Sequence, residues 1–585
     1  MDNLSDLLVN VQKPGRYIGG EWNSVKKYWT ADKIKVLLAF PDLYEVGMSY
    51  LGMKILYGIL NGRDDCVCER AFSPWLDFEA GLRKNSISLF SLESRRPIKD
   101  FDIIGLSLAY ELTFTNVLNL LDLGEIPKRS VDRADSDPLI VAGGPSCYNP
   151  EPMAEFIDAF VIGDGEEAML EIIEAYKGAR DKEQRTRVGL LRRLAKIKGL
   201  YVPSLYHVEY TSDHTIKKFS AIEDGIPSKV EKRVVANLDN AFYPTKQIVP
   251  NIQIVHDRIS IEIMRGCKHA CSFCQATTTY HPWRERRRGE ILKLAKESYA
   301  MTGYDEISLL SLSSSDYSGI IYLVEDLNKE FSQRGVSISI PSLRIQDVLK
   351  GLPILISKVK KSGLTFAPEA GSDCLRKAVN KNINIEKLFQ AALESFKNGW
   401  RHVKLYFMIG LPREEDEDIF DMADLICRIS ELKRKVDGKP AHVTASINAF
   451  VPKPHTPLQW AGMAAIEALE RKRKMLKNAV KSNLIKLSFH SFQMSCIEAA
   501  LSRGDRRLWR AIYESWKAGS RFDGWQEVFN FNTWIKSFEK TGLDPFFYIN
   551  RARSFDEILP WDFIDVGLSR QSLFNRAGNI CKTVI

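Results

Sequence analysis

The chain has 585 residues, and its 82 lysines and arginines against 74 aspartates and glutamates give a mild net charge of +8. This balance does not by itself indicate a nucleic-acid partner. No apolar run approaches the roughly 18 residues of a membrane span, and the N-terminus lacks the basic start and apolar core of a signal peptide, so we expect a cytoplasmic protein without a membrane partner.

The first third of the chain predicts a sheet whose strands end in glycine-rich loops. Residues 51–60 predict a helix, and apolar runs of strand length lie at residues 34–40, 103–107, 139–142 and 159–162. Gly143-Gly-Pro145 and Gly163-Asp-Gly-Glu166 close the last two strands. Such strands are typical of a doubly wound sheet that binds a ligand at its C-terminal edge.

Three cysteines, Cys267, Cys271 and Cys274, follow the next apolar run at residues 259–264. Zinc normally requires four ligands, and no second cysteine pair or His-x3-5-His follows, while His269 is a weak candidate for the fourth position. A disulfide is not expected, because nothing marks the protein as secreted. Three close thiolates on a loop that leaves a strand can instead hold three irons of a 4Fe-4S cluster, leaving the fourth iron open.

The region around these cysteines predicts a parallel sheet. Apolar runs at residues 259–264, 306–312, 336–340, 363–367, 401–409 and 442–450 alternate with helix-length segments such as residues 290–302 and 415–434. Continuous apolar strands separated by helices indicate a sheet that is buried on both faces.

The last part of the chain is rich in aromatic residues. Tryptophans and phenylalanines crowd residues 509–547, which predicts a small helical core rather than a base-stacking platform. Basic clusters at residues 284–288, 471–474 and 503–507 are typical of solvated helix faces, with nucleic acid as the alternative partner. The other seven cysteines are predicted to be reduced thiols: Cys66, Cys68, Cys147, Cys374, Cys427, Cys496 and Cys581.

Five motifs, in this order, resemble the radical S-adenosylmethionine (SAM) superfamily. The cysteine motif is followed by Ser342-Leu-Arg344, Ala367-Pro-Glu-Ala-Gly-Ser372, Phe407-Met-Ile-Gly-Leu-Pro412 and Phe450-Val-Pro-Lys-Pro-His-Thr-Pro457. The last two resemble the subgroup that includes methylthiotransferases and Elongator-type enzymes. The resemblance covers about residues 255–490 and implies a partial TIM (β/α)6 barrel with active residues at the C-terminal ends of its strands.

The resemblance also assigns roles to single residues. In that family the three cysteines bind the cluster, and SAM chelates the open iron through its amino and carboxylate groups. Phe273 would lie near the adenine and Arg344 near the SAM carboxylate, while the ribose would be contacted by the motif of Glu369, Gly371 and Ser372.

One departure concerns the SAM amino group. Many members carry Gly-Gly-Glu at the end of the second strand, whereas this chain has Ser311-Leu-Ser-Ser-Ser-Asp316. Serine hydroxyls can accept a hydrogen bond from an ammonium group, so Ser311 and Ser313 are the candidate ligands.

The N-terminal sheet resembles the cobalamin-binding domain found ahead of many radical SAM barrels. Asp42-x-Tyr44-x-x-Gly47 occupies the place of its D-x-H-x-x-G motif, Ser107 that of its serine, and Gly143-Gly144 that of its double glycine. Tyr44 stands where cobalt-ligating members have histidine, so no imidazole can coordinate cobalt from there. Two interpretations stay open: cobalamin bound without a protein ligand below the metal, and a Rossmann-like domain that only packs on the barrel.

Together these patterns predict an α/β chain of five segments. They are an extension (residues 1–30), a Rossmann-like doubly wound domain (31–180), a linker with short strands (181–254), the partial TIM barrel (255–490) and a small, mainly helical C-terminal region (491–585).

The resemblance implies an enzyme that splits SAM reductively to a 5′-deoxyadenosyl radical, with flavodoxin or ferredoxin as the electron donor. Three functions stay open: cobalamin-assisted methylation or related C–H functionalisation, cobalamin-free modification of RNA, and a non-enzymatic iron-sulfur scaffold. The absence of a second cluster-type cysteine set in residues 1–150 argues against the second. The substrate, whether a small molecule, a peptide or an RNA, is left open.

Overall fold

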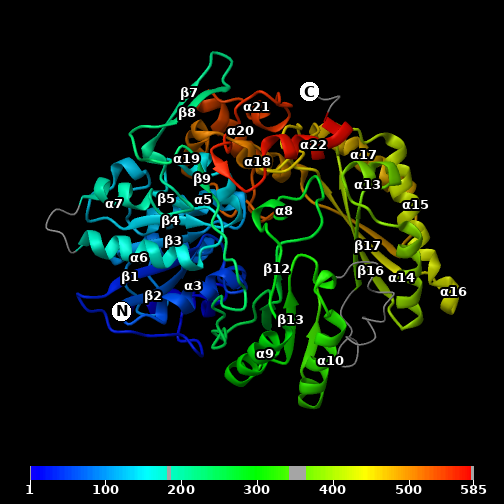
Figure 1. The fold of residues 1–585 in the computed structure, drawn as a ribbon, viewed down its shortest axis with the longest axis horizontal. Helices are drawn as coiled ribbons and strands as arrows, with labels where there is room; N and C mark the ends of the chain where they lie inside the picture. The colour runs from blue at the N-terminus through cyan, green and yellow to red at the C-terminus, as the bar shows by residue number, and fades with distance from the viewer. Residues whose placement is uncertain (1, 181–185, 342–363, 582–585) are drawn as a thin grey trace.

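The computed structural model describes residues 2–180, 186–341 and 364–581. Figure 1 shows the N-terminal sheet and its helices in blue and cyan, the strands near β13 in green, those near β16 in yellow to orange, and the C-terminal helices in orange and red. The α/β class predicted from the sequence is confirmed.

The N-terminal sheet has the strand order β2-β1-β3-β4-β5-β6, in which β1 to β5 are parallel and β6 is antiparallel to β5. The order 2-1-3-4-5 is that of flavodoxin-like doubly wound folds, where ligands bind at the switch point between β1 and β3. The strands are β1 (Ile34–Phe40), β2 (Cys66–Phe72), β3 (Ile103–Ser107), β4 (Leu139–Gly143), β5 (Ala159–Val161) and β6 (Leu200–Tyr201).

The strand β2 is absent from the sequence prediction. All its residues are buried, including Glu69 and Arg70, whose charges hide the strand in a search for apolar runs. Arg70 is neutralised by Glu21 at 2.9 Å and by Glu93 at 2.6 Å. Buried charges occur in proteins when they are paired in this way, and this pairing exists only in the folded chain.

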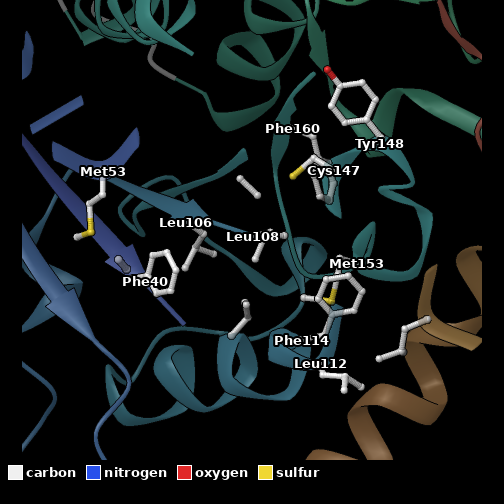
Figure 2. Packing of buried hydrophobic residues seen from close by; sticks show 14 of the residues in the cluster. Phe40, Met53, Leu106, Leu108, Leu112, Phe114, Cys147, Tyr148, Met153 and Phe160 are labelled. Carbon is white, nitrogen blue, oxygen red and sulfur yellow. The ribbon is translucent and has the colours of Figure 1, made fainter. Parts of the chain in front are cut away.

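Helices cover the sheet in the manner of a doubly wound fold. Helix α3 contacts α6, and α4 contacts α5. Figure 2 shows part of the apolar layer, with Phe40 of β1, Leu106 of β3 and Leu108 just after β3, and Cys147 buried among apolar neighbours. The helices are α3 (Leu51–Asn61), α4 (Leu76–Lys84), α5 (Phe114–Leu123), α6 (Glu166–Arg180) and α7 (Arg187–Leu194).

Residues 200–231, within the predicted linker with short strands, form strands β6 to β9. Strand β6 joins the N-terminal sheet, so this sheet extends beyond residue 180. Strands β7 (Tyr206–Tyr210) and β8 (Ile216–Ala221) form a hairpin that projects from the molecule in Figure 1. Strand β9 (Val230–Glu231) pairs with β19 (Ile564–Asp565) near the end of the chain.

The second α/β unit is built from two parallel sheets. The first, in the order β10-β13-β14, packs its apolar side on α9 (Arg288–Thr302) and α10 (Ile320–Phe331). Its strands are β10 (Ile259–Glu262), β13 (Glu306–Leu310) and β14 (Ser337–Ser339). Residues 342–363, which follow β14, lie outside the described residues, so the closure of a barrel between the two sheets stays a prediction.

The second of these sheets has the order β15-β16-β17-β18. Its apolar side packs on α14 (Ile385–Lys397), α15 (Asp416–Leu432) and α17 (Ile466–Ala479). The strands are β15 (Leu364–Glu369), β16 (His402–Ile409), β17 (His442–Ala449) and β18 (Ile485–Phe489). All six predicted strands of this unit are present, and β18 is an additional one, which the sequence hides because polar residues alternate along it.

The C-terminal helices join the N-terminal sheet to the second unit. Helix α19 contacts α5, and the predicted aromatic core is confirmed, since Trp534 and Phe538 are fully buried. The helices are α18 (Phe492–Arg503), α19 (Trp509–Lys517), α20 (Phe531–Lys540), α21 (Pro545–Ile549) and α22 (Arg570–Cys581). No helix in the described part of the chain combines the length and the apolarity needed to span a bilayer.

Candidate active site

The loop that carries the three cysteines starts from a short antiparallel strand pair, β11 (Met264–Arg265) and β12 (Arg284–Glu285). Gly266 has a φ of 89°, and a Cβ there would lie 2.7 Å from Tyr280 O and 2.9 Å from Trp283 Cα. Glycine is required because no side chain fits between these backbone atoms. The glycine therefore fixes the direction in which the chain enters the loop.

Cys274 ends the loop in a tight turn. Its backbone N–H donates to Cys271 O at 3.1 Å, and its carbonyl accepts from Thr277 Oγ1 at 2.7 Å. Burial raises the pKa of Cys274, and the nearby charges of Cys267 and Glu369 raise it further. Both hydrogen bonds fix the backbone of the last cysteine at the end of the loop.

Phe273 anchors the loop to the other predicted motifs. Its ring packs against a small apolar cluster that includes Ala370 after β15, Leu411 after β16, and Phe450 after β17. The backbone supports this packing, since Ser272 N–H donates to Val379 O at 2.9 Å. Four motifs that are far apart in the sequence thus meet at the C-terminal ends of these strands, as expected for an active site in a parallel barrel.

Glu369 ends β15 in a left-handed backbone conformation, with φ of 71° and a register shift before it. This conformation is unfavourable for residues other than glycine and is often found at functional sites. The carboxylate accepts from Lys381 Nζ at 3.1 Å. Burial raises the pKa of Glu369, while the ammonium group of Lys381 opposes this shift.

The two residues after Ala370 shape the turn that follows. A Cβ on Gly371 would lie 1.9 Å from Asp418 O, so this glycine allows the close approach of α15. Ser372 is the N-cap of α13 (Asp373–Ala378), and its hydroxyl accepts from Leu375 N–H at 3.1 Å. The structure gives both residues a folding role, and their predicted contact with SAM stays a prediction.

A cavity of about 480 Å³ lies between the N-terminal sheet and β10 to β13. On one side it is lined by the C-terminal edge of the doubly wound sheet, with Leu38 of β1, Ser107 of β3 and Gly143 of β4. On the other side it is lined by Glu262 and Ser311. This is the switch-point edge at which such sheets bind ligands, and the volume is typical of ligand pockets.

Two glycines that line this cavity are not required by the fold. A Cβ on Gly143 would meet nothing nearer than 3.7 Å, and a Cβ on Gly165 nothing nearer than 3.8 Å. Gly144 differs, because its φ is 118° and a Cβ would lie 2.6 Å from Leu108 O. The missing side chains of Gly143 and Gly165 leave room in the cavity, which is how backbone approaches a ligand closely.

Arg265 connects the cavity to the cysteine loop, and sequence reasoning missed it. Its guanidinium binds Glu262 at 2.9 Å, Asp164 at 2.9 Å and Glu166 at 2.7 Å. All four residues line the cavity. The three carboxylates raise the pKa of Arg265 against the effect of burial, so it stays charged. The elaborate Gly163-Asp-Gly-Glu166 loop, two residues of which hold this arginine, was the available signal.

Two family models match the chain. Residues 52–203 match the model described as "Radical SAM proteins, N-terminal", and residues 261–426 match "Radical SAM superfamily", which spans the cysteine loop and Glu369. The chain is a radical SAM protein.

Several proteins are similar to this radical SAM protein. MJ0966 of Methanocaldococcus jannaschii, described as uncharacterised, is 28% identical over 81% of the chain and 89% of its own length. The ribosomal protein uS12 methylthiotransferase RimO of a Thermoanaerobacter species is 24% identical over 28% of the chain and 39% of its own length. A tRNA-2-methylthio-N(6)-dimethylallyladenosine synthase of Syntrophomonas wolfei is 26% identical over 29% of the chain and 40% of its own length.

Solved structures align with lower identity. The radical SAM methyltransferase TsrM of Kitasatospora setae, with cobalamin and a 4Fe-4S cluster bound, aligns at a TM-score of 0.49 and 14% identity over 71% of the chain and 75% of TsrM. The cobalamin-dependent SAM radical enzyme OxsB aligns at a TM-score of 0.45 and 12% identity over 87% of the chain and 71% of OxsB.

Radical SAM enzymes use a 4Fe-4S cluster and SAM, and Cys267, Cys271 and Cys274 stay the predicted ligands of the cluster. Among the described residues, no three histidine, cysteine or acidic side chains are arranged to hold a single metal ion. A cluster needs a different arrangement, because each of its thiolates binds a different iron. His269 Nε2 lies 2.7 Å from Asp316 Oδ2, so this histidine has its own partner.

The Asp42, Tyr44 and Gly47 motif does not line the cavity of this radical SAM protein. Tyr44 is buried, and its hydroxyl donates to Glu21 Oε1 at 2.9 Å. Asp42 accepts from Trp525 Nε1 at 2.9 Å, and a Cβ on Gly47 would lie 2.4 Å from the Phe72 ring. All three residues have structural partners, and their predicted contact with cobalamin stays a prediction.

The residues predicted to bind the SAM amino and carboxylate groups differ in their surroundings. Ser311 lines the cavity, and its hydroxyl lies 2.8 Å from that of Ser314. Ser313 is buried at the start of a short 3-10 helix. Arg344 lies outside the described residues.

Proposed function

We propose that this radical SAM enzyme activates a C–H bond of its substrate at the C-terminal ends of β10 to β17 and uses cobalamin, held in the interdomain cavity, to methylate or otherwise functionalise the carbon. When bound, the cluster and SAM supply a 5′-deoxyadenosyl radical, and cobalamin supplies a methyl group. The observation that carries the proposal is the meeting of Phe273, Ala370, Leu411 and Phe450 around the cysteine loop.

The residues of the chain hold and orient these groups. Cys267, Cys271 and Cys274 would bind three irons, and the apolar cluster around Phe273 excludes water from that side. Glu369 would accept hydrogen bonds from ribose hydroxyls, and the ammonium group of Lys381 opposes the rise in the pKa of Glu369 that burial causes. Orientation and exclusion of water are the usual contributions of a protein to cofactor chemistry.

The cavity supports cobalamin as the second cofactor. It lies at the switch point of a flavodoxin-like sheet, and Gly143 and Gly165 leave its wall open where side chains would fit. Tyr44 is held by Glu21 and has no imidazole, so we propose binding without a protein ligand to cobalt from this position. An acidic flavodoxin or ferredoxin in the cytoplasm would supply the electron.

A second candidate is cobalamin-free modification of RNA, favoured by the similarity to the tRNA methylthio-adenosine synthase over 29% of the chain. The N-terminal cysteines do not support a second cluster. Cys66, Cys68 and Cys147 are each buried, and burial raises the pKa of all three thiols. A non-enzymatic scaffold is the third candidate, and SAM turnover would contradict it.

The test uses anaerobically reconstituted protein with dithionite and SAM, analysed by mass spectrometry. We expect 5′-deoxyadenosine from the parent protein and from Cys374→Ala, which removes an exposed cysteine, but not from Cys271→Ala. S-adenosylhomocysteine beside it would support methylation. The absence of 5′-deoxyadenosine from parent protein with an intact cluster and added cobalamin would contradict the proposed chemistry.

The cofactor is tested separately by absorbance. Protein incubated with hydroxocobalamin and desalted should retain corrinoid absorbance, and Gly165→Leu should reduce this retention because its side chain enters the cavity. Equal retention by Gly165→Leu and the parent, or none by either, would contradict cobalamin binding at this site.

A further inference from the structure

The two faces of the sheet of β15 to β18 differ in polarity. The apolar face, with Val403, Leu405 and Val443, is buried under helices. Along β16 to β18, every second residue points to the opposite side, here called the polar face, and is half-buried or exposed. The residues of the polar face are His402, Lys404, Tyr406, Met408, His442, Thr444, Ser446, Asn448, Lys486 and Ser488. Parallel sheets are normally apolar on both faces, so the polar face calls for an explanation.

The strand register brings the two lysines of this face into one row. Lys404 pairs with Thr444, and Thr444 pairs with Lys486, so the side chains of the three residues stand on the same side. Neighbouring strands are about 4.8 Å apart, which puts the lysine Cα atoms about 10 Å from each other with the threonine hydroxyl between them. His402 Nε2 lies 2.9 Å from Thr444 Oγ1.

The charge of the polar face is of one sign. None of its members is acidic, and neither Lys404 nor Lys486 makes an ion pair with a described carboxylate. Lys404 Nζ lies 4.7 Å from the centre of the Tyr406 ring instead. Two ammonium groups beside hydroxyls and imidazoles form a site that attracts an anion.

The basic clusters for which the sequence left nucleic acid open as a partner differ from the polar face in their ion pairs. Many of their members are already paired with carboxylates: Arg284 with Asp164, Arg287 with Asp239, Arg288 with Asp326, Arg471 with Asp416, Lys472 with Glu414, Arg473 with Glu470, Arg506 with Glu151 and Arg507 with Asp505. Their charges stabilise the fold or are screened at the surface, whereas the charges of the polar face have no such described partner.

The polar face leads to the cysteine loop. Met408 belongs to this face and packs against the apolar cluster that also holds Phe273. Lys404 is four residues before Met408 on the same strand, a distance of about 13 Å along β16. A molecule bound by the lysines can therefore reach the site of chemistry with its other end.

We propose that the substrate of this enzyme carries an anionic group, a phosphate or a carboxylate, which Lys404 and Lys486 bind with Thr444 between them. This proposal rests on the proposed function, and it deepens it by naming the substrate class. Because Lys404 and Met408 lie about 13 Å apart along β16, we expect the reacting carbon at about that distance from the anionic group. Apolar and cationic substrates are thereby excluded.

The test measures anion binding to the full-length reconstituted protein by isothermal titration calorimetry at low ionic strength, where charge interactions are least screened. Inorganic pyrophosphate is the probe in one arm and malonate in the other. We expect one of them to bind, and the tighter one identifies the group as phosphate or carboxylate. Its Kd should rise at least tenfold in the double variant Lys404→Gln/Lys486→Gln.

The matched control is Lys474→Gln/Lys481→Gln, which removes the same charge from two exposed lysines outside the polar face and should bind like the parent. Equal binding by the two double variants, or no binding of either anion by the parent, would overturn the proposal. Because no turnover is measured, this failure is distinct from a failure to form 5′-deoxyadenosine. Thermal unfolding of each variant checks that the fold is intact.

Discussion

Single residues in this protein act where segments far apart in the sequence meet. Arg265 ends β11 and precedes the first cysteine by two positions, yet two of its three carboxylates come from the start of α6, namely Glu166 and Asp164 just before it. The charge that holds the N-terminal domain against the cysteine loop is therefore buried on all sides. A buried charge that loses its partners destabilises a fold strongly, whereas an exposed pair contributes little.

Arg265→Met is expected to lower the free energy of unfolding by about 3–5 kcal/mol, because it leaves the carboxylates of Glu166 and Glu262 buried without their cation, while Asp164 keeps its pair with Arg284. Urea unfolding followed by circular dichroism measures this. Arg287→Met is the control, since its side chain is 80% exposed and its pair with Asp239 should matter by less than about 1 kcal/mol. Similar losses in the two variants would contradict the role given to Arg265.

At the scale of elements, helix starts and strand ends determine where the chemistry can occur. Strand β15 ends at Glu369, the turn passes under α15 at Gly371, and α13 starts at Ser372. The motif that the family uses for SAM is thus also the connection between a strand and a helix. Its residues carry folding and binding roles together, which a motif match alone does not separate.

Ser372→Ala separates the two roles. Loss of the N-cap should lower stability by about 1 kcal/mol, as should Ser491→Ala, the N-cap of α18, whose hydroxyl accepts from Met494 N–H at 3.3 Å. If Ser372 also contacts the ribose, only its variant weakens SAM binding severalfold in equilibrium dialysis. Unchanged SAM binding in Ser372→Ala would show that the serine is a cap alone.

At the scale of the whole molecule, the C-terminal region locks onto the N-terminal sheet through the Phe522-Asp-Gly-Trp525 motif. Thr115 Oγ1 of α5 donates to Asp523 at 2.7 Å, and Trp534 Nε1 donates to it at 3.0 Å. Asn116 Oδ1 accepts from Phe522 N–H at 2.8 Å. The structure makes this motif a contact between the C-terminal region and the N-terminal sheet.

This contact should make stability depend on pH. Burial raises the pKa of Asp523 to about 6, whereas an unfolded aspartate titrates near about 3.9. Between these values the native state keeps a proton that the unfolded chain has released, so its stability falls as the pH rises from about 4 to about 6 and stays lower above that. The full difference is about 3 kcal/mol.

Asp523→Asn removes this titration. Its unfolding free energy relative to the parent should therefore rise by about 2 kcal/mol between pH 4 and pH 6.5, as measured by urea unfolding at several pH values. The comparison between the two proteins cancels the other titrating groups. A difference that does not change with pH would contradict the raised pKa of Asp523.

The sequence by itself determined the local features of this protein. The parallel strands at residues 259–264 and 401–409, the cysteine loop and the glycine-rich ends of β4 and β5 were predicted because apolar periodicity and turn residues act over a few positions. Membership of the radical SAM superfamily followed from motifs in order along the chain. These features need no knowledge of which segments lie beside one another.

Only the tertiary structure decided the rest. Strand β2 was hidden because Arg70 finds its partners in Glu21 and Glu93, and nothing in the sequence indicated that the Tyr44 hydroxyl donates to Glu21. The row of Lys404, Thr444 and Lys486 exists only through strand register. The physical reason is common to all of them: charge pairing, cavities and sheet faces depend on distances between residues that are remote in sequence, and those distances are set when the chain folds.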